Sequence, residues 1–316
     1  MLTSPPSFSD IKRAHQRIAK YIYNTPVMTS ANLDELAGCK MFFKCENFQK
    51  IGAFKMRGAT NAIFSYRPED RTNGFACHSS GNHGQAVALA AKLADSKAYV
   101  VMPKGAPQVK VDAVRGYGAE VILCEPTEES RESTCNEVIE KTGAILIHPF
   151  NDYNIIAGQA TASKELIEEV ENLDALIAPV GGGGLASGMS LVSHFLDPNL
   201  ELYVGEPEEV DECYRSLKNG KMVANKTANT IADGLKASIG PKNFEILSEH
   251  IKEVLLVSEE EIIRAMKLIW ERMKIVIEPS CAVPFAAILR NPTVFEGKRV
   301  GIILTGGNVD LTKLPF

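Results

Sequence analysis

The sequence lacks long apolar runs, clusters of basic residues and closely spaced cysteines. A membrane-spanning helix needs roughly 20 apolar residues, and neither such a run nor a secretory leader is seen, so we expect a cytoplasmic protein without a membrane partner. The net charge of −5 and the lack of a basic patch argue against nucleic acid as a partner. The seven cysteines form no Cys-x-x-Cys pair, which indicates buried thiols in a reducing compartment rather than disulfides or a zinc site.

The composition is that of an ordinary globular protein, with 45% hydrophobic and 23% charged residues in a chain of 316. Near the N-terminus we expect a helix that begins at Ser9 and Asp10, a second over 31–37, a strand at 41–43 and a third helix beginning at Lys55. Predicted strands then alternate with predicted helices. The strands lie at 75–78, 98–102, 120–123, 144–147, 175–180, 202–205, 254–257 and 300–304, and the helices at 84–93, 107–115, 128–142, 158–170 and 259–273.

Most of these strands are continuous apolar runs, which is typical of parallel sheets covered by helices on both faces. We therefore predict an α/β fold with two doubly wound, mainly parallel-sheet domains. Residues 1–73 and 152–316 are expected to form the larger domain, and residues 74–151 the smaller one. Ligands of such folds bind at the carboxyl ends of the strands, where each motif described below is found.

The first motif contains a lysine at a predicted helix start. Lys55 lies between Phe54 and Met56, in the stretch Gly52-Ala53-Phe54-Lys55-Met56-Arg57-Gly58-Ala59. One interpretation is a solvated surface lysine. The other is a Schiff-base lysine whose pKa is lowered by an apolar pocket. The stretch itself does not distinguish between them.

The second motif is the polar turn Ser79-Ser80-Gly81-Asn82-His83-Gly84, between a strand and a helix. Backbone N–H groups at such a helix N-terminus can bind an anion, although a simple capped turn is the alternative. Asn82 could donate a hydrogen bond to a phenolate-type oxygen, and Ser80 could act as a proton donor.

The third motif is the run Gly181-Gly182-Gly183-Gly184 after a buried strand. Four consecutive glycines are entropically costly and suit a loop whose N–H groups surround a phosphate. The run also fits the dinucleotide pattern G-x-G-x-x-A, with Glu206 as the acid that would bind a ribose. A nicotinamide-dependent dehydrogenase is therefore an alternative from another functional class.

Two further features complete the set. Thr305, in Thr305-Gly306-Gly307-Asn308, could donate a hydrogen bond to a ring nitrogen, or the segment could be an ordinary turn. The acidic run at 206–212 could hold a hard divalent cation, or form a solvated loop. Pyridoxal phosphate has a group for each of these features. It carries an aldehyde for Lys55, a phosphate for the glycines, a phenolic oxygen for Asn82 and a ring nitrogen for Thr305.

In order and spacing, these motifs resemble those of the serine racemase and threonine dehydratase family of fold-type II pyridoxal-phosphate enzymes. The resemblance covers essentially the whole chain. It implies an active site in the cleft between a large cofactor-binding domain and a small substrate-binding domain. It also implies that Lys55 and Ser80 are the two catalytic acid–base groups, on opposite faces of the cofactor. The residues implied at the cofactor are Phe54, Lys55, Asn82, Gly181, Gly182, Gly183, Gly184, Leu185 and Thr305. Those implied at the substrate are Ser79, Ser80, Asn82 and His83.

The same resemblance implies a divalent cation, with Mg²⁺ expected, bound by Glu206, the carbonyl of Val210, and Glu212. It further implies a homodimer, with ATP as a possible effector. The indications about the substrate conflict. Ala53 is also found in relatives that act on threo-3-hydroxyaspartate, whereas the segment 232–238, ending in Ser238, is of the racemase and serine/threonine dehydratase type. Arg131 matches an arginine that can meet a distal carboxylate of the substrate. Thr305 departs from the serine usual in close relatives but retains the hydroxyl.

The resemblance implies α-proton removal by Lys55, followed by β-elimination to a 2-oxo acid and ammonia, or by reprotonation from Ser80 to the other enantiomer. We therefore predict a serine racemase and L-serine (threonine) dehydratase. A threo-3-hydroxyaspartate dehydratase of the same family is the closest alternative. β-Replacement, as in cysteine synthases, is disfavoured because that branch typically has threonine at the position of His83.

Overall fold

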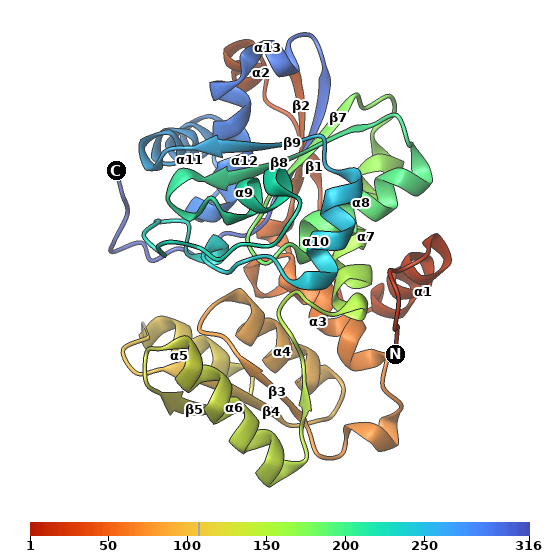
Figure 1. Cartoon of the computed structure of the whole chain (residues 1–316), viewed down its shortest axis with the longest axis vertical. Coiled ribbons are helices and arrows are strands. Elements are labelled where there is room, and N and C mark those ends of the chain that lie inside the picture. Colours follow the sequence, from red (N-terminus) through yellow and green to blue (C-terminus); the bar gives the residue numbers. More distant parts are fainter. Residues whose placement is uncertain (107) are drawn as a thin grey trace.

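The strands form two separate sheets in the computed structural model, which describes residues 1–106 and 108–316 (Figure 1). The larger sheet has the order β1-β2-β10-β7-β8-β9, with β10 in its interior. Its strands are β1 (Val27–Met28), β2 (Lys40–Cys45), β10 (Arg299–Leu304), β7 (Ala175–Pro179), β8 (Glu201–Pro207) and β9 (Glu253–Val257). All neighbours pair in parallel except β1, which is antiparallel to β2.

The smaller sheet is entirely parallel, with the order β5-β4-β3-β6. Its strands are β3 (Phe75–His78), β4 (Ala98–Pro103), β5 (Glu120–Cys124) and β6 (Ile145–Leu146). Its helices are α4 (Asn82–Leu93), α5 (Gln108–Gly116) and α6 (Glu128–Thr142). Phe75 and Cys77 pack in one apolar cluster with α4 and α5, whereas Ala76 packs in another with Cys135 of α6. This alternation along β3 buries both faces of the sheet.

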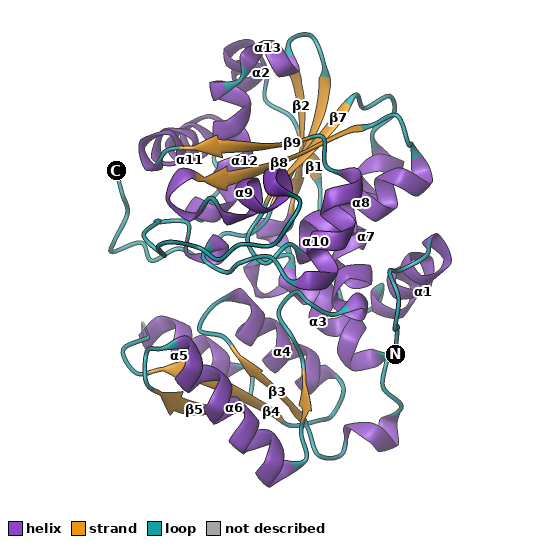
Figure 2. Cartoon of the chain, viewed as in Figure 1, coloured by secondary structure: helices purple, strands orange, loops and turns teal. Residues whose placement is uncertain are grey.

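Helices also cover both faces of the larger sheet (Figure 2). On one face, α2 (Ala31–Ala37), α11 (Glu259–Met273) and α12 (Pro279–Arg290) pack against the side chains of Met41, Phe43 and Ile177. On the other face, α7 (Tyr153–Glu169), α8 (Gly184–Leu196) and α10 (Pro241–His250) pack against Leu176 and Val204. The remaining helices are α1 (Phe8–Ile18), α3 (Lys55–Phe64), α9 (Glu212–Asn219) and α13 (Pro292–Phe295).

The prediction of two mainly parallel α/β units is confirmed, and so are the predicted bounds of α2, α6, α11 and β3. The predicted start of the first helix at Ser9 is wrong, because Ser7 and Asp10 form a capping box and α1 begins at Phe8. Helix α7 begins five residues earlier than predicted, since Asp152 accepts hydrogen bonds from the first-turn N–H groups. The predicted helix 107–115 includes Pro107, which lies outside the described residues.

An ion cluster buried between α3 and α7 fixes the helix that begins with Lys55. Arg57 lies 2.7 Å from Glu46 and 2.7 Å from Glu165, and Lys44 lies 2.8 Å from Glu165. Arg57, Lys44 and Glu46 are fully buried. The two helices also approach closely at Gly158, where a Cβ atom would lie 2.7 Å from the carbonyl oxygen of Arg57. Because a buried charge left without its partner is costly, this cluster holds α3 in one position.

In the part of the chain that the structure describes, no helix has the length and apolar character needed to cross a membrane.

Candidate active site

The loop that precedes Lys55 pairs with the loop that follows β10. The Phe54 N–H donates to the carbonyl of Thr305 at 3.0 Å, and the Gly307 N–H donates to the carbonyl of Gly52 at 3.0 Å. These two bonds form an isolated antiparallel bridge between Ala53 and Gly306, beyond the parallel pairing of β2 with β10. The predicted loops that contain Lys55 and Thr305 are therefore adjacent, although about 250 residues separate them in the sequence.

Lys55 is the first residue of α3, and its Nζ donates a hydrogen bond to the carbonyl of Pro149 at 2.9 Å. The ammonium lies 5.2 Å from the centroid of the Phe54 ring. Burial lowers the pKa of Lys55 to about 8, and the nearby carboxyl of Glu278 opposes this shift. An amine with this pKa is partly neutral near physiological pH, which suits it to nucleophilic attack and to proton transfer.

The polar turn between β3 and α4 lies at the carboxyl end of the smaller sheet. Ser79 accepts a hydrogen bond from the Gly81 N–H at 3.2 Å, and Ser80 follows it in a partly buried position. The predicted helix start at residue 84 is wrong, because α4 begins at Asn82. Asn82 and His83 therefore project from the first helical turn, where the helix dipole favours a negatively charged ligand.

His83 is a neutral imidazole. Its Nε2 lies 2.8 Å from the carbonyl of Ile147, so Nε2 carries the proton, and no partner for Nδ1 is found in the described part of the chain. Burial and the positive charge of Lys55 lower the pKa of His83 to about 3. The free Nδ1 can accept a hydrogen bond, so His83 suits a ligand with a donor group rather than an anion.

Asn82 connects the two sheets. Its Nδ2 donates to the carboxyl oxygens of Glu278 at 2.9 and 3.2 Å, and its Oδ1 accepts from Nδ2 of Asn308 at 2.8 Å. Glu278 is only 4% exposed, and burial and the negative charge of Asp233 raise its pKa to about 8. Sequence reasoning missed Glu278, which is a single acidic residue without a surrounding motif.

The glycine loop connects β7 to the N-terminus of α8, as predicted. A Cβ atom on Gly182 would lie 2.2 Å from the Phe150 ring, and one on Gly183 would lie 2.7 Å from Cβ of Asn243. Gly183 has a φ of 90°, which a residue with a side chain rarely adopts. No side chain caps the N-terminus of α8. Its N–H groups are therefore available to an anion such as a phosphate.

Thr305 is 3% exposed, and its Oγ1 has no hydrogen-bond partner among the described residues. A buried hydroxyl without a partner costs free energy unless a ligand satisfies it. A ring nitrogen that accepts a hydrogen bond would do so. Together with the amine of Lys55, the amide of Asn82 and the N-terminus of α8, this donor set fits pyridoxal phosphate.

His148 is a further site residue that sequence reasoning missed. Its Nδ1 accepts hydrogen bonds from the N–H groups of Phe150 at 3.2 Å and Asn151 at 2.8 Å, so its proton is on Nε2. Burial lowers the pKa of His148 to about 4, with contributions from His78 and Lys55. The sequence does not indicate that His148 lies near Lys55, because a lone histidine before a proline matches no motif.

Two substrate residues, Arg131 and Ser238, are predicted from weaker indications. Arg131 is on α6, where its Nε donates to the carbonyl of Thr127 at 3.3 Å. Burial lowers the pKa of His78, and the charge of Arg131 contributes to this shift. Ser238 is partly exposed in the segment before α10. Among the described contacts, neither side chain is hydrogen-bonded to Lys55 or Asn82.

The predicted cation ligands lie together at the end of β8. Glu206 accepts hydrogen bonds from the N–H groups of Cys213 at 2.8 Å and Tyr214 at 2.9 Å, and Glu212 accepts one from Ile239 at 2.6 Å. Val210 is buried and ends the short 3₁₀ helix η4 (Glu208–Val210). Burial raises the pKa of Glu206 to about 8 and that of Glu212 to about 7.

This donor set of two buried carboxyl groups and a carbonyl matches the preference of a hard divalent cation. Within residues 1–106 and 108–316, no group of three or more His, Cys, Asp or Glu side chains is arranged around a metal position.

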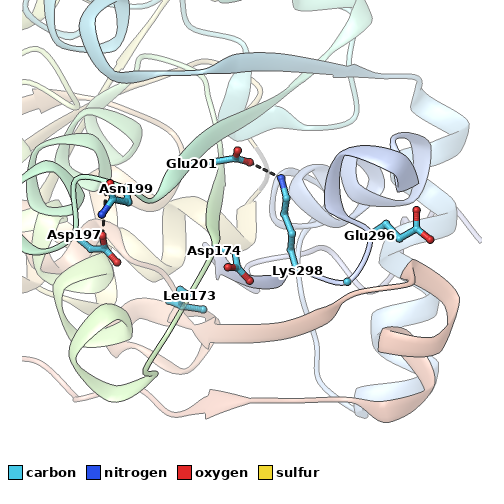
Figure 3. Close-up of a pocket in the computed structure, with 8 residues that line it drawn as sticks. Leu173, Asp174, Asp197, Asn199, Glu201, Glu296 and Lys298 are labelled. Atoms are coloured by element: carbon cyan, nitrogen blue, oxygen red, sulfur yellow. Dashed lines mark hydrogen bonds and ion pairs between the residues drawn. The ribbon is translucent and has the colours of Figure 1, made fainter.

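A pocket elsewhere on the large unit is not part of this site (Figure 3). Asp174, Glu201 and Lys298 line it, at the amino ends of β7, β8 and β10. Lys298 forms an ion pair with Glu201 at 2.5 Å. Because ligands of parallel α/β sheets bind at the carboxyl ends of the strands, the pocket is at the wrong edge for the catalytic site.

Comparisons with known proteins agree with this donor set. A family model described as "Pyridoxal-phosphate dependent enzyme" matches residues 18–306. The chain is 52% identical to a serine racemase of Dictyostelium discoideum, over 98% of this chain and 96% of the relative. It is 49% identical to a beta-hydroxyaspartate dehydratase of Paracoccus denitrificans (strain Pd 1222), over 98% of this chain and 99% of the relative. The solved structure of the Dictyostelium discoideum serine racemase aligns with a TM-score of 0.92 and 53% identity, over 96% of this chain and 99% of that one.

Proposed function

Since the chain belongs to the family of pyridoxal-phosphate-dependent enzymes, we propose that it racemises and dehydrates serine and related hydroxy-amino acids. The family resemblance and the fold type predicted from the sequence are confirmed. The proposal rests on three groups: the buried amine of Lys55, the amide of Asn82, and the hydroxyl of Thr305, which has no partner among the described residues. The substrate class follows from relatives described as a serine racemase and a beta-hydroxyaspartate dehydratase.

The chain's own residues suggest how the cofactor would be held. Lys55 would bind it covalently through Nζ, with the Phe54 ring packing beside it. The N–H groups of the loop from Gly181 to Leu185 would bind the phosphate, Asn82 would donate to the ring oxygen, and Thr305 would donate to the ring nitrogen. When bound, pyridoxal phosphate supplies an electron sink that stabilises negative charge on the α-carbon of the substrate.

Proton transfer is assigned to two groups. Lys55 Nζ takes the α-proton, since burial has already lowered its pKa to about 8. Ser80 returns a proton from the opposite face, which gives the other enantiomer. When the β-hydroxyl leaves first, the product is a 2-oxo acid and ammonia. Ser79, in the turn before α4, and Asn82 and His83, on its first turn, bind the substrate.

We assign a different role to each of the two units. Residues 1–73 and 152–316 form the cofactor-binding domain, and residues 74–151 form the substrate-binding domain. Asn82 from the smaller unit and Glu278 from the larger one are hydrogen-bonded, which supports a site at their junction. Arg131 would bind a distal carboxylate when the substrate carries one. Ser238 would also contact the substrate.

The alternative substrate is threo-3-hydroxyaspartate, favoured by the 49% identity to a beta-hydroxyaspartate dehydratase and by Arg131 on α6. A panel of L-serine, D-serine, L-threonine and threo-3-hydroxyaspartate, read for 2-oxo acid and for chirality, tests the proposal. We expect conversion of L-serine to D-serine together with pyruvate. Turnover of hydroxyaspartate alone would support the alternative, and turnover of none of the four would refute both.

We also propose a divalent cation, with Mg²⁺ expected, held by Glu206, the carbonyl of Val210, and Glu212. Removing the cation with EDTA is expected to lower the thermal unfolding midpoint by a few degrees, because two neighbouring buried carboxyl groups then lack a positive partner. Added Mg²⁺ should restore the midpoint, measured by scanning calorimetry. The matched control is Glu212→Gln, in which EDTA should have little effect. An unfolding midpoint of the native protein that ignores EDTA would contradict the cation site.

We also propose a homodimer. Phe48 and Val276 expose apolar side chains, and a hydrogen bond of 3.2 Å from Asn47 to the carbonyl of Val276 joins the two segments that carry them. An effect of ATP and a cytoplasmic location stay predictions from the sequence.

A further inference from the structure

The amide of Asn82 belongs to a chain of hydrogen bonds that begins at a backbone carbonyl. Asn308 Nδ2 donates to the carbonyl of Ile51 at 2.7 Å and to Oδ1 of Asn82 at 2.8 Å. Asn82 Nδ2 then donates to Glu278. This series of hydrogen bonds joins four separate segments of the sequence, and Glu278 is its last acceptor.

The direction of this chain is fixed. A carbonyl oxygen only accepts hydrogen bonds, so Ile51 requires the nitrogen of the Asn308 amide to face it. The second hydrogen of that nitrogen then faces Asn82, which must turn its Oδ1 toward Asn308. Asn82 Nδ2 consequently faces Glu278, whose carboxyl group accepts one of its two hydrogens.

Glu278 is itself held firmly. Its backbone N–H donates to the carbonyl of Gly306 at 3.0 Å, and it occupies the N-cap position of α12, where its side chain forms no capping hydrogen bond among the described residues. A Cβ atom on Gly306 would lie 2.8 Å from Oε1 of Glu278, so the carboxyl group fills the space where a side chain would be. Likewise, a Cβ atom on Gly52 would lie 2.8 Å from Oδ1 of Asn308. Two glycines thus accommodate both ends of the chain.

We propose that Glu278 is a positioning residue that holds the Asn82 amide with its second N–H directed at the ring oxygen of the cofactor. The inference rests on the proposed contact between Asn82 and that oxygen. Without an acceptor at residue 278, the Asn82 amide is held only at its Oδ1, by Asn308, and its Nδ2 is no longer fixed beside the ring oxygen. Glu278 therefore acts through Asn82 and touches neither substrate nor cofactor.

The test is a double-mutant cycle of Glu278→Ala and Asn82→Ala in the full chain. The dissociation constant of pyridoxal phosphate is measured by following the visible absorbance band as the cofactor is added back. We expect Glu278→Ala to weaken cofactor binding about tenfold in the native background, the effect of one lost hydrogen bond to a charged or buried group. In the Asn82→Ala background the same change should weaken binding less than about twofold.

Glu278→Gln is the conservative partner of this test. It retains an acceptor oxygen in the same place, so cofactor binding and the pH dependence of the visible band should match those of the native protein. Urea unfolding of all variants reports whether they are folded, and Glu278→Leu, which has no acceptor but retains a larger side chain, replaces Glu278→Ala in the cycle if that variant does not fold.

Three outcomes would overturn the inference. They are an equal loss of affinity from Glu278→Ala in both backgrounds, an unchanged affinity in Asn82→Ala, and a loss in Glu278→Gln as large as in Glu278→Ala. Failure of the proposed function gives a different result, since the native protein would then show no visible band with pyridoxal phosphate.

Discussion

Lys55→Ala is expected to lower both the racemisation and the dehydration of L-serine by at least about a thousandfold. The variant loses the covalent attachment of the cofactor and the group that removes the α-proton, each of which contributes orders of magnitude. It should also lose the visible absorbance band that borohydride bleaches in the native protein. Coupled assays for pyruvate and for D-serine, run beside absorbance spectra, measure all three effects.

The chain offers two controls for this experiment. Lys92→Ala removes an exposed lysine from α4 and should leave the spectrum and both activities unchanged. Lys55→Arg keeps a positive charge in the pocket, but a guanidinium is not deprotonated in proteins and cannot replace the amine. A colourless native protein, or a Lys55→Ala variant with full activity, would refute the assignment of Lys55.

Ser80→Ala is expected to abolish racemisation while dehydration of L-serine persists. Dehydration requires proton removal by Lys55 and departure of the β-hydroxyl, whereas racemisation also requires a proton from the opposite face. We expect D-serine formation to fall at least about a hundredfold and pyruvate formation to stay within about tenfold of the native rate. Chiral chromatography of the products separates the two reactions.

Ser248→Ala, which removes an exposed hydroxyl from α10, is the matched control and should change neither reaction. The two-base assignment fails if Ser80→Ala reduces both products equally. It also fails if D-serine forms at the native rate.

Much of the candidate site could be predicted because it is built from short loops after apolar strands. The glycine loop, the Lys55 stretch and the turn at Asn82 each combine small residues with polar ones, and the parallel fold brings strand ends together. The sheet order explains why the Lys55 loop and the Thr305 loop are adjacent, since β2 and β10 are neighbours in the sheet. The sequence carries no such signal for Glu278, whose hydrogen bond with Asn82 crosses the junction of the two units, or for His148, whose Nδ1 is held by the N–H groups of Phe150 and Asn151.

The errors in the fold have physical causes of the same kind. Helix α12 went unpredicted because Pro279 and Pro284 resemble turn residues, although Pro279 occupies the first helical position, where its missing N–H costs nothing. Helix α10 begins with Pro241 in the same way. Helix α4 starts earlier than predicted because its first turn is polar, and apolar periodicity cannot reveal such a turn.

The interior position of β10 has a consequence for the order in which the protein assembles. This strand, 299–304, lies between β2 and β7, so the two halves of the larger sheet stay separate until it is synthesised. Pairing β2 with β10 closes a loop of about 250 residues, a non-local step that slows folding and leaves two strand edges exposed to aggregation on the ribosome. Because Thr305 and Asn308 follow β10 directly, the proposed cofactor site is complete only when that final strand is inserted.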